Sequence, residues 1–195
     1  MGVSTSAVAQ PQMDEELTFC PETEREAREQ IRRLMTRYDL SAWIFAKEVR
    51  ILCGVEARSH PIVTLNTDYL EDDERQLSIF IHGKIHVFVG DPASKRNAVD
   101  DLRAMFPDAP NDDFRLFQHI VVGWLELDGL AEILGEKRAR EVIEAKVAAA
   151  ADQYPNEIHE PYEWYYRQVI DNTSRIGAVL ERHRLVITPT KGLAL

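Results

Sequence analysis

Two histidines that lie four positions apart in an apolar run place the strongest constraint on how this chain can fold. The run covers residues 77–89, reads L-S-I-F-I-H-G-K-I-H-V-F-V, and carries His82 and His86. On an α-helix, this spacing brings both imidazole rings to one face, about 6 Å apart along the axis. Two rings arranged in this way can bind a single metal ion.

Residues 68–89 are compatible with either a helix or a hairpin. As a hairpin, residues 78–81 and 85–89, which are rich in isoleucine, valine and phenylalanine, would flank a turn at His82-Gly83-Lys84. Local propensity slightly favours this alternative, because a glycine inside a helix costs about 1 kcal/mol relative to alanine. Acidic residues before the run, and Gly90-Asp91-Pro92 after it, are typical of the start and the end of a helix and favour the helix.

The rest of the sequence predicts a mostly helical α+β domain with a small N-terminal β-sheet. A chain of 195 residues is expected to form one domain. We expect a disordered N-terminal segment at residues 1–18, a single domain at 19–187 and a tail at 188–195. Apolar spacing predicts further helices near residues 21–39, 92–106, 114–134, 136–154 and 162–183, with a break at 155–161. Strands are predicted at 42–52 and 60–67.

The composition argues against nucleic acid and membranes as partners, and it bears on the compartment in which the protein is found. The formal net charge is −10, from 33 acidic and 23 basic residues, which argues against nucleic acid or an anionic membrane as the main partner. No run approaches the roughly 20 apolar residues of a membrane span. The two cysteines, Cys20 and Cys53, are too few for a disulfide framework. We predict free thiols in a reducing compartment, and therefore a cytoplasmic protein.

A third metal ligand is expected from the predicted helix at 114–134. This helix offers His119 and Glu126, which lie seven residues apart and share one face. They are separated by about 10 Å along the axis, so only one is expected to reach the same ion as His82 and His86. The alternative interpretation is a buried, hydrogen-bonded histidine and a surface glutamate.

Four segments, in this order, resemble a bacterial family of uncharacterised zinc-peptidase-like proteins. They are S-H-P-I-V-T-L-N-T at residues 59–67, H-G-K-I-H-V at 82–87, H-I-V-V-G-W-L-E at 119–126, and the stretch from Tyr165-Tyr166 to His183-Arg184-Leu185. The resemblance covers most of the chain from about residue 59. It implies that the run with His82 and His86 is a helix, that the core is zincin-like, and that these histidines bind zinc.

The chain departs from this family at the position that matters most for catalysis. The family has H-E-Q-x-H, whereas Gly83 and Lys84 stand here in place of the glutamate and glutamine. That glutamate takes a proton from the attacking water and passes it to the leaving group, which glycine cannot do. Losing a positioned acid or base typically lowers the rate about 10²–10⁴-fold. We therefore expect a degenerate, pseudoenzyme-like member with a zinc site and weak or no hydrolase activity.

Two alternatives stay open. The first is an active metallohydrolase that uses a replacement base such as Glu126. The second is a protein-interaction or regulatory module that retains the peptide groove, where a peptide segment would pair with an edge strand that begins at His60 and ends at Thr67. In a zinc hydrolase, Tyr165, Tyr166 or His183 could stabilise the oxyanion.

Overall fold

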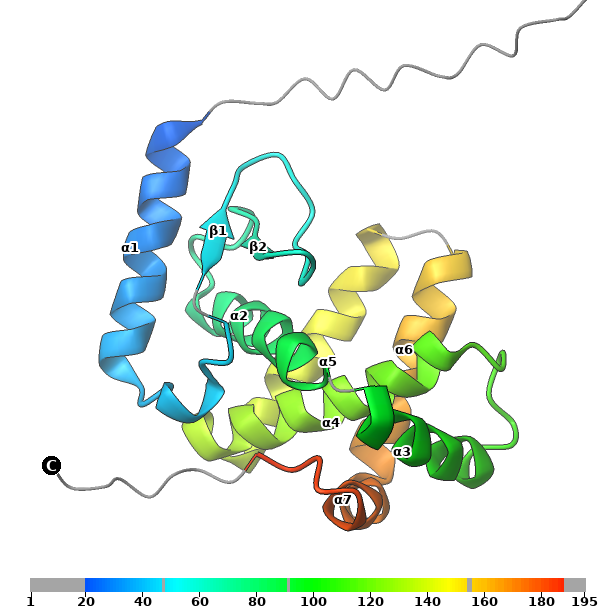
Figure 1. The fold of residues 1–195 in the computed structure, drawn as a ribbon. Coiled ribbons are helices and arrows are strands. Elements are labelled where there is room, and N and C mark those ends of the chain that lie inside the picture. Colours follow the sequence, from blue (N-terminus) through cyan, green and yellow to red (C-terminus); the bar gives the residue numbers. More distant parts are fainter. Residues whose placement is uncertain (1–19, 47, 91, 154–155, 188–195) are drawn as a thin grey trace, which may run out of the picture.

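The computed structural model describes residues 20–46, 48–90, 92–153 and 156–187. It is mostly helical with a small parallel sheet, which confirms the predicted α+β class (Figure 1). The helices are α1 (Pro21–Arg37), α2 (Asp73–Phe88), α3 (Pro92–Met105), α4 (Phe114–Leu134), α5 (Glu136–Gln153), α6 (Asn156–Asp171) and α7 (Thr173–Arg182). The strands are β1 (Val49–Ile51) and β2 (Val63–Leu65), and a 3-10 turn, η1 (Ser41–Trp43), precedes them. The predicted N-terminal segment and tail lie outside the described residues.

Helix α4 is the centre of the fold. It packs against α2, α3, α5, α6 and α7, and its bounds match the prediction (Figure 1). Its sequence is apolar on almost every side, as expected for a helix that its neighbours surround. The Asp113 carboxylate begins the helix by accepting a hydrogen bond from the Arg115 backbone N–H, and Gly135 ends it with a φ of 86°. Two of the candidate functional residues, His119 and Glu126, are therefore positioned by a helix that its neighbours surround.

The segment with the two histidines is a helix, so the helix prediction is confirmed and the hairpin is excluded. Asp72 begins α2 by accepting a hydrogen bond from the Arg75 backbone N–H at 2.9 Å. Gly83 has a packing role within α2, because a Cβ atom there would lie 3.0 Å from Val63 Cγ1 in β2. The glycine thus lets the helix lie close to the sheet, which compensates for its poor helix propensity.

The predicted strand at residues 42–52 is wrong over most of its length. Only Val49–Ile51 forms a strand, and Trp43 belongs to the 3-10 turn η1. The Trp43 side chain is buried against Gly129 of α4, where a Cβ atom would lie only 2.7 Å from the indole ring. Burial of this large ring against α4 has overridden the local strand propensity of the segment.

The C-terminal helices also differ from the prediction. Helix α6 already begins at Asn156 and contains Pro161, so the break predicted at residues 156–161 is wrong. A proline inside a helix removes one backbone hydrogen bond, and the packing of α6 against α4 and α5 offsets that loss. The single helix predicted at 162–183 is divided at Asn172 into α6 and α7.

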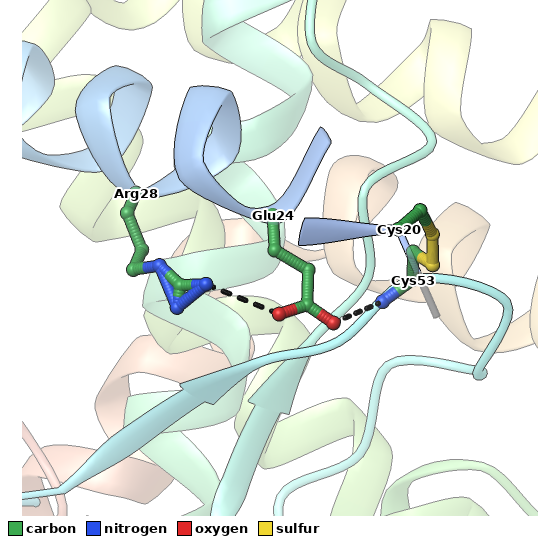
Figure 2. Close-up of a disulfide and its surroundings, with 4 residues drawn as sticks. All are labelled: Cys20, Glu24, Arg28 and Cys53. Carbon is green, nitrogen blue, oxygen red and sulfur yellow. Dashed lines mark hydrogen bonds and ion pairs between the residues drawn. A yellow bond between two sulfur atoms is a disulfide. The ribbon is translucent and has the colours of Figure 1, made fainter. Parts of the chain in front are cut away.

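A disulfide joins Cys20, at the start of α1, to Cys53, just after β1 (Figure 2). The prediction of two free thiols is therefore wrong. Glu24 on α1 strengthens the same junction, because its carboxylate accepts a hydrogen bond from the Cys53 backbone N–H and pairs with Arg28 (Figure 2). Disulfides persist in oxidising compartments, so the cytoplasmic location loses the support that free thiols would give it. Among the described residues, none of the helices combines the length and the apolar character needed to cross a membrane.

Reduction of this disulfide is expected to lower the free energy of unfolding by about 4 kcal/mol, because the bond closes a loop between cysteines 33 positions apart. Denaturant unfolding with and without a reductant measures this difference. A Cys20→Ser/Cys53→Ser variant is the matched control, since its stability should not respond to the reductant. Equal stability of the native chain in both conditions would contradict the prediction.

Candidate metal centre

Three histidines from two helices converge on one point. His82 and His86 lie on α2, and His119 lies on α4. One ring nitrogen from each histidine belongs to a group of three nitrogen atoms that all lie within 4.8 Å of one another. The Nε2 atoms of His82 and His86 are 3.1 Å apart. In a tetrahedral zinc site with Zn–N bonds of about 2.0–2.1 Å, the ligand nitrogens are about 3.3 Å apart. The His82–His86 pair therefore already has about the separation that such a site needs, whereas the group of three, which spans up to 4.8 Å, would have to draw closer to bind one ion.

Hydrogen bonds behind the rings orient two of the three histidines. His82 Nδ1 lies 2.8 Å from Glu126 Oε2, and His119 Nδ1 lies 2.7 Å from the Arg115 carbonyl oxygen. A carboxylate and a carbonyl only accept, so both Nδ1 atoms carry the proton and both Nε2 atoms are left with a lone pair. Partners of this kind hold metal-binding imidazoles in the correct tautomer and orientation.

Burial keeps the three rings neutral. Desolvation, reinforced by the positive charge of Lys146, lowers the pKa of His82 to about 4 despite the opposing effect of Glu126. Desolvation also lowers the pKa of His86 and of His119. Neutral imidazole is the form that binds a metal, so the cluster is ready to bind an ion at neutral pH without first losing protons.

Glu126 supports the cluster from behind and is not part of the three-histidine group. Its carboxylate is fully buried and accepts hydrogen bonds from Ser78, His82, Lys146 and Tyr166. Burial alone would raise the pKa of Glu126, but Lys146 and His82 outweigh that effect and lower it. The group is therefore an ionised carboxylate with four donors, facing the Nδ1 side of His82.

The other residues singled out in the sequence lie in different places. Tyr165 is beside the cluster, with its ring centroid 5.4 Å from that of His119, whereas the Tyr166 hydroxyl is engaged by Glu126 and Lys146. His183 follows α7 and bonds to Asp101 of α3. Lys84 is directed away from the cluster, because its Nζ donates to the Ala46 carbonyl oxygen at 2.7 Å.

Two cavities reach the histidine cluster. The first, here the arginine cavity, has a volume of about 450 Å³ and is lined by His60, Arg58, Arg115 and all three cluster histidines. The second, here the tyrosine cavity, has a volume of about 480 Å³ and is lined by Glu56, Asp113, Tyr162, Tyr165, His82, His119 and also Arg115, which the two cavities share. Both volumes are typical of small-molecule sites. A ligand in either cavity would lie beside the cluster.

The predicted edge strand at residues 60–67 is shorter than expected, and its edge is in use. Strand β2 covers Val63–Leu65 and pairs in parallel with β1 on one side. On the other side, the Thr64 backbone N–H and carbonyl bond to Arg58 at 2.7 and 2.9 Å. A peptide could add to β2 at this point only by displacing Arg58.

Several residues of the site gave no recognisable signal in the sequence. Lys146 stands in an alanine-rich helix that reads as a surface element, and Ser78 in an apolar run. Arg58, Arg115 and Glu56 are in or beside loops, where single charged residues are common. Their roles depend on how distant segments pack together, and the spacing of residues along the chain does not reveal that packing.

The chain matches no protein-family model, no curated protein and no solved structure.

Proposed function

We propose that this chain is a zinc-binding protein of the zincin-like kind, a degenerate relative of zinc peptidases. The observation that carries the proposal is the convergence of His82, His86 and His119 on one point next to two cavities. Three neutral histidines that leave a fourth position open are a ligand set of catalytic zinc sites. A zinc ion held there would supply a Lewis acid that polarises a bound carbonyl group. The H-x-x-x-H pair on α2 and a third ligand on a following helix also support the zincin comparison.

Weak or absent hydrolysis is the expected consequence of Gly83. The helix position after His82 carries no acid or base, and β2 lies against it at Val63. Glu126 is poorly placed as a replacement base, because it is buried and faces the Nδ1 side of His82 with four donors around it. Its role in this proposal is to hold the proton on His82 Nδ1.

An active metallohydrolase is the second candidate, and Glu56 is the observation that favours it. Glu56 lines the tyrosine cavity together with His82 and His119, so its carboxylate shares a cavity with two of the proposed ligands. Chelator-sensitive hydrolysis of labelled casein that is lost in a Glu56→Gln variant would support this candidate over the inactive form.

Elemental analysis of the purified, tag-free chain tests the proposal. We expect about one zinc ion per chain after dialysis against metal-free buffer. A chain that contains no metal and takes up none from added zinc would contradict the proposal. The cavities would then have to serve a ligand without any metal.

Restoring the missing glutamate requires space as well as the side chain. A side chain at residue 83 meets Val63, so Gly83→Glu alone is expected to destabilise the contact between α2 and β2 by about 1–3 kcal/mol. The Gly83→Glu/Val63→Ala variant makes room and should gain chelator-sensitive hydrolysis of labelled casein. Gly83→Gln/Val63→Ala is the matched control, with the same shape and no base. Equal activity of the two double variants would show that the glutamate does not act as a base there.

A further inference from the structure

The arginine cavity is lined by positive charges, whereas the protein as a whole is acidic. The chain carries a net charge of −10, yet this cavity is lined by Arg58 and Arg115. Among the described residues, no aspartate or glutamate lines it. A divalent ion on the three histidines would add further positive charge to the same space. Such a cavity favours an anionic ligand.

The fold positions both arginines at this cavity through their backbones. Arg58 is held by its two backbone hydrogen bonds to Thr64 of β2. Arg115 is in the first turn of α4, and its carbonyl oxygen accepts the hydrogen bond that orients His119. Strand β2 and the start of α4 thus fix the backbone positions from which the two exposed arginine side chains extend at the cavity.

Both guanidinium groups are available to a ligand. Among the residues that the structure describes, no carboxylate pairs with Arg58 or Arg115, whereas Arg138, for example, contacts both Glu74 and Glu141. Guanidinium groups bind carboxylates through pairs of parallel, charge-assisted hydrogen bonds. A carboxylate is therefore a ligand group that this cavity suits.

The occupied edge of β2 limits the length of the ligand that the cavity can hold. An extended peptide that paired with β2 would have to displace Arg58 from Thr64. A compact ligand that ends in a carboxylate needs no such displacement. The cavity volume of about 450 Å³ is also suited to a ligand of small-molecule size.

We propose that the arginine cavity binds a small ligand with a terminal carboxylate, either a free acid or the end of a peptide. Arg58 and Arg115 bind the carboxylate, and the neighbouring carbonyl group is directed toward the histidine cluster. The second part rests on the proposed function, because it needs a zinc ion on the histidines. The first part depends on the two arginines alone.

Calorimetric titration of the full chain tests this proposal with N-acetylalanine and its neutral amide, N-acetylalaninamide. The zinc-loaded chain should bind the acid and show no measurable binding of the amide. Arg58→Gln and Arg115→Gln should each weaken binding of the acid about tenfold or more, because each removes a charge-assisted contact. Arg25→Gln, an exposed arginine on α1, is the matched control and should bind the acid like the parent chain.

The outcomes separate this proposal from the function on which it rests. Equal binding of acid and amide, or binding of the acid that neither arginine variant weakens, would overturn it even with one zinc ion per chain. A chain without zinc contradicts the proposed function, and titration of that chain with the acid still reports on Arg58 and Arg115. Trialanine that binds as well as N-acetylalanine would indicate a peptide end as the natural ligand, whereas binding of N-acetylalanine alone would indicate a free acid.

Discussion

His119→Ala is expected to lower the affinity for zinc by more than about 100-fold while the chain stays folded. Loss of a hydrogen-bonding partner behind a metal ligand already costs about 10–100-fold, and this substitution removes the ligand itself. His119 is half-buried at the edge of two cavities, so its removal leaves little empty space in the core. Competition with a chromophoric chelator measures the affinity, and the far-ultraviolet circular dichroism spectrum reports the helices.

Two control variants show whether this loss is specific to the cluster. His183→Ala removes a histidine that bonds to Asp101 and lines neither cavity, so it should bind zinc like the parent chain. His60→Ala removes a ring whose centroid is 6.4 Å from that of His86 but which is outside the three-histidine group, and it should also retain the metal. If His60→Ala abolished zinc binding and His119→Ala retained it, the proposed ligand set would be contradicted.

Lys146→Met is expected to lower the free energy of unfolding by about 3–5 kcal/mol. Lys146 donates to the fully buried Glu126 carboxylate at 2.6 Å, and its side chain is only 7% exposed. Methionine has a similar length and no charge, so Glu126 would lose its only lysine partner among the described residues. Breaking a buried ion pair from one side is strongly destabilising, because the other charge stays buried without compensation. Denaturant unfolding measures the loss.

A surface pair in the same helix is the control for Lys146. Lys137 is 93% exposed and lies 3.9 Å from Glu141, so Lys137→Met should change the stability by less than about 0.5 kcal/mol. The Lys146→Met/Glu126→Gln double variant should recover part of the loss, since it no longer buries an unpaired charge. If Lys146→Met proved as stable as Lys137→Met, Glu126 would not be an ionised partner of Lys146.

Periodicity along the sequence predicted one of the two helices that carry the histidine cluster, and the other needed further signals. The apolar pattern of α4 predicts its bounds, and the resemblance and the flanking residues predict that the run with His82 and His86 is helical. The choice between His119 and Glu126 could not be made from spacing, because the two residues share one face of α4. Packing brings His119 beside His86 in the cluster, whereas Glu126, two turns further along, meets the far side of His82.

The features that the sequence did not reveal all depend on contacts between distant segments. The Cys20–Cys53 bond requires the start of α1 to lie beside the loop after β1. Burial of Trp43 against Gly129 replaces a predicted strand with a turn. Pairing of Lys146 with Glu126 requires α5 to pack along α4. In each case a local pattern had a reasonable interpretation, and tertiary packing selected another one.

X-ray absorption spectroscopy of the zinc-loaded chain tests the central claim, a single zinc ion held by three histidines. We predict three imidazole nitrogens at about 2.0–2.1 Å together with one further light ligand, and no sulfur, because Cys20 and Cys53 are joined to each other. The His119→Ala chain, loaded at high zinc concentration, should lose one imidazole from the fit. A sulfur ligand at about 2.3 Å, or an imidazole count that His119→Ala leaves unchanged, would contradict the claim.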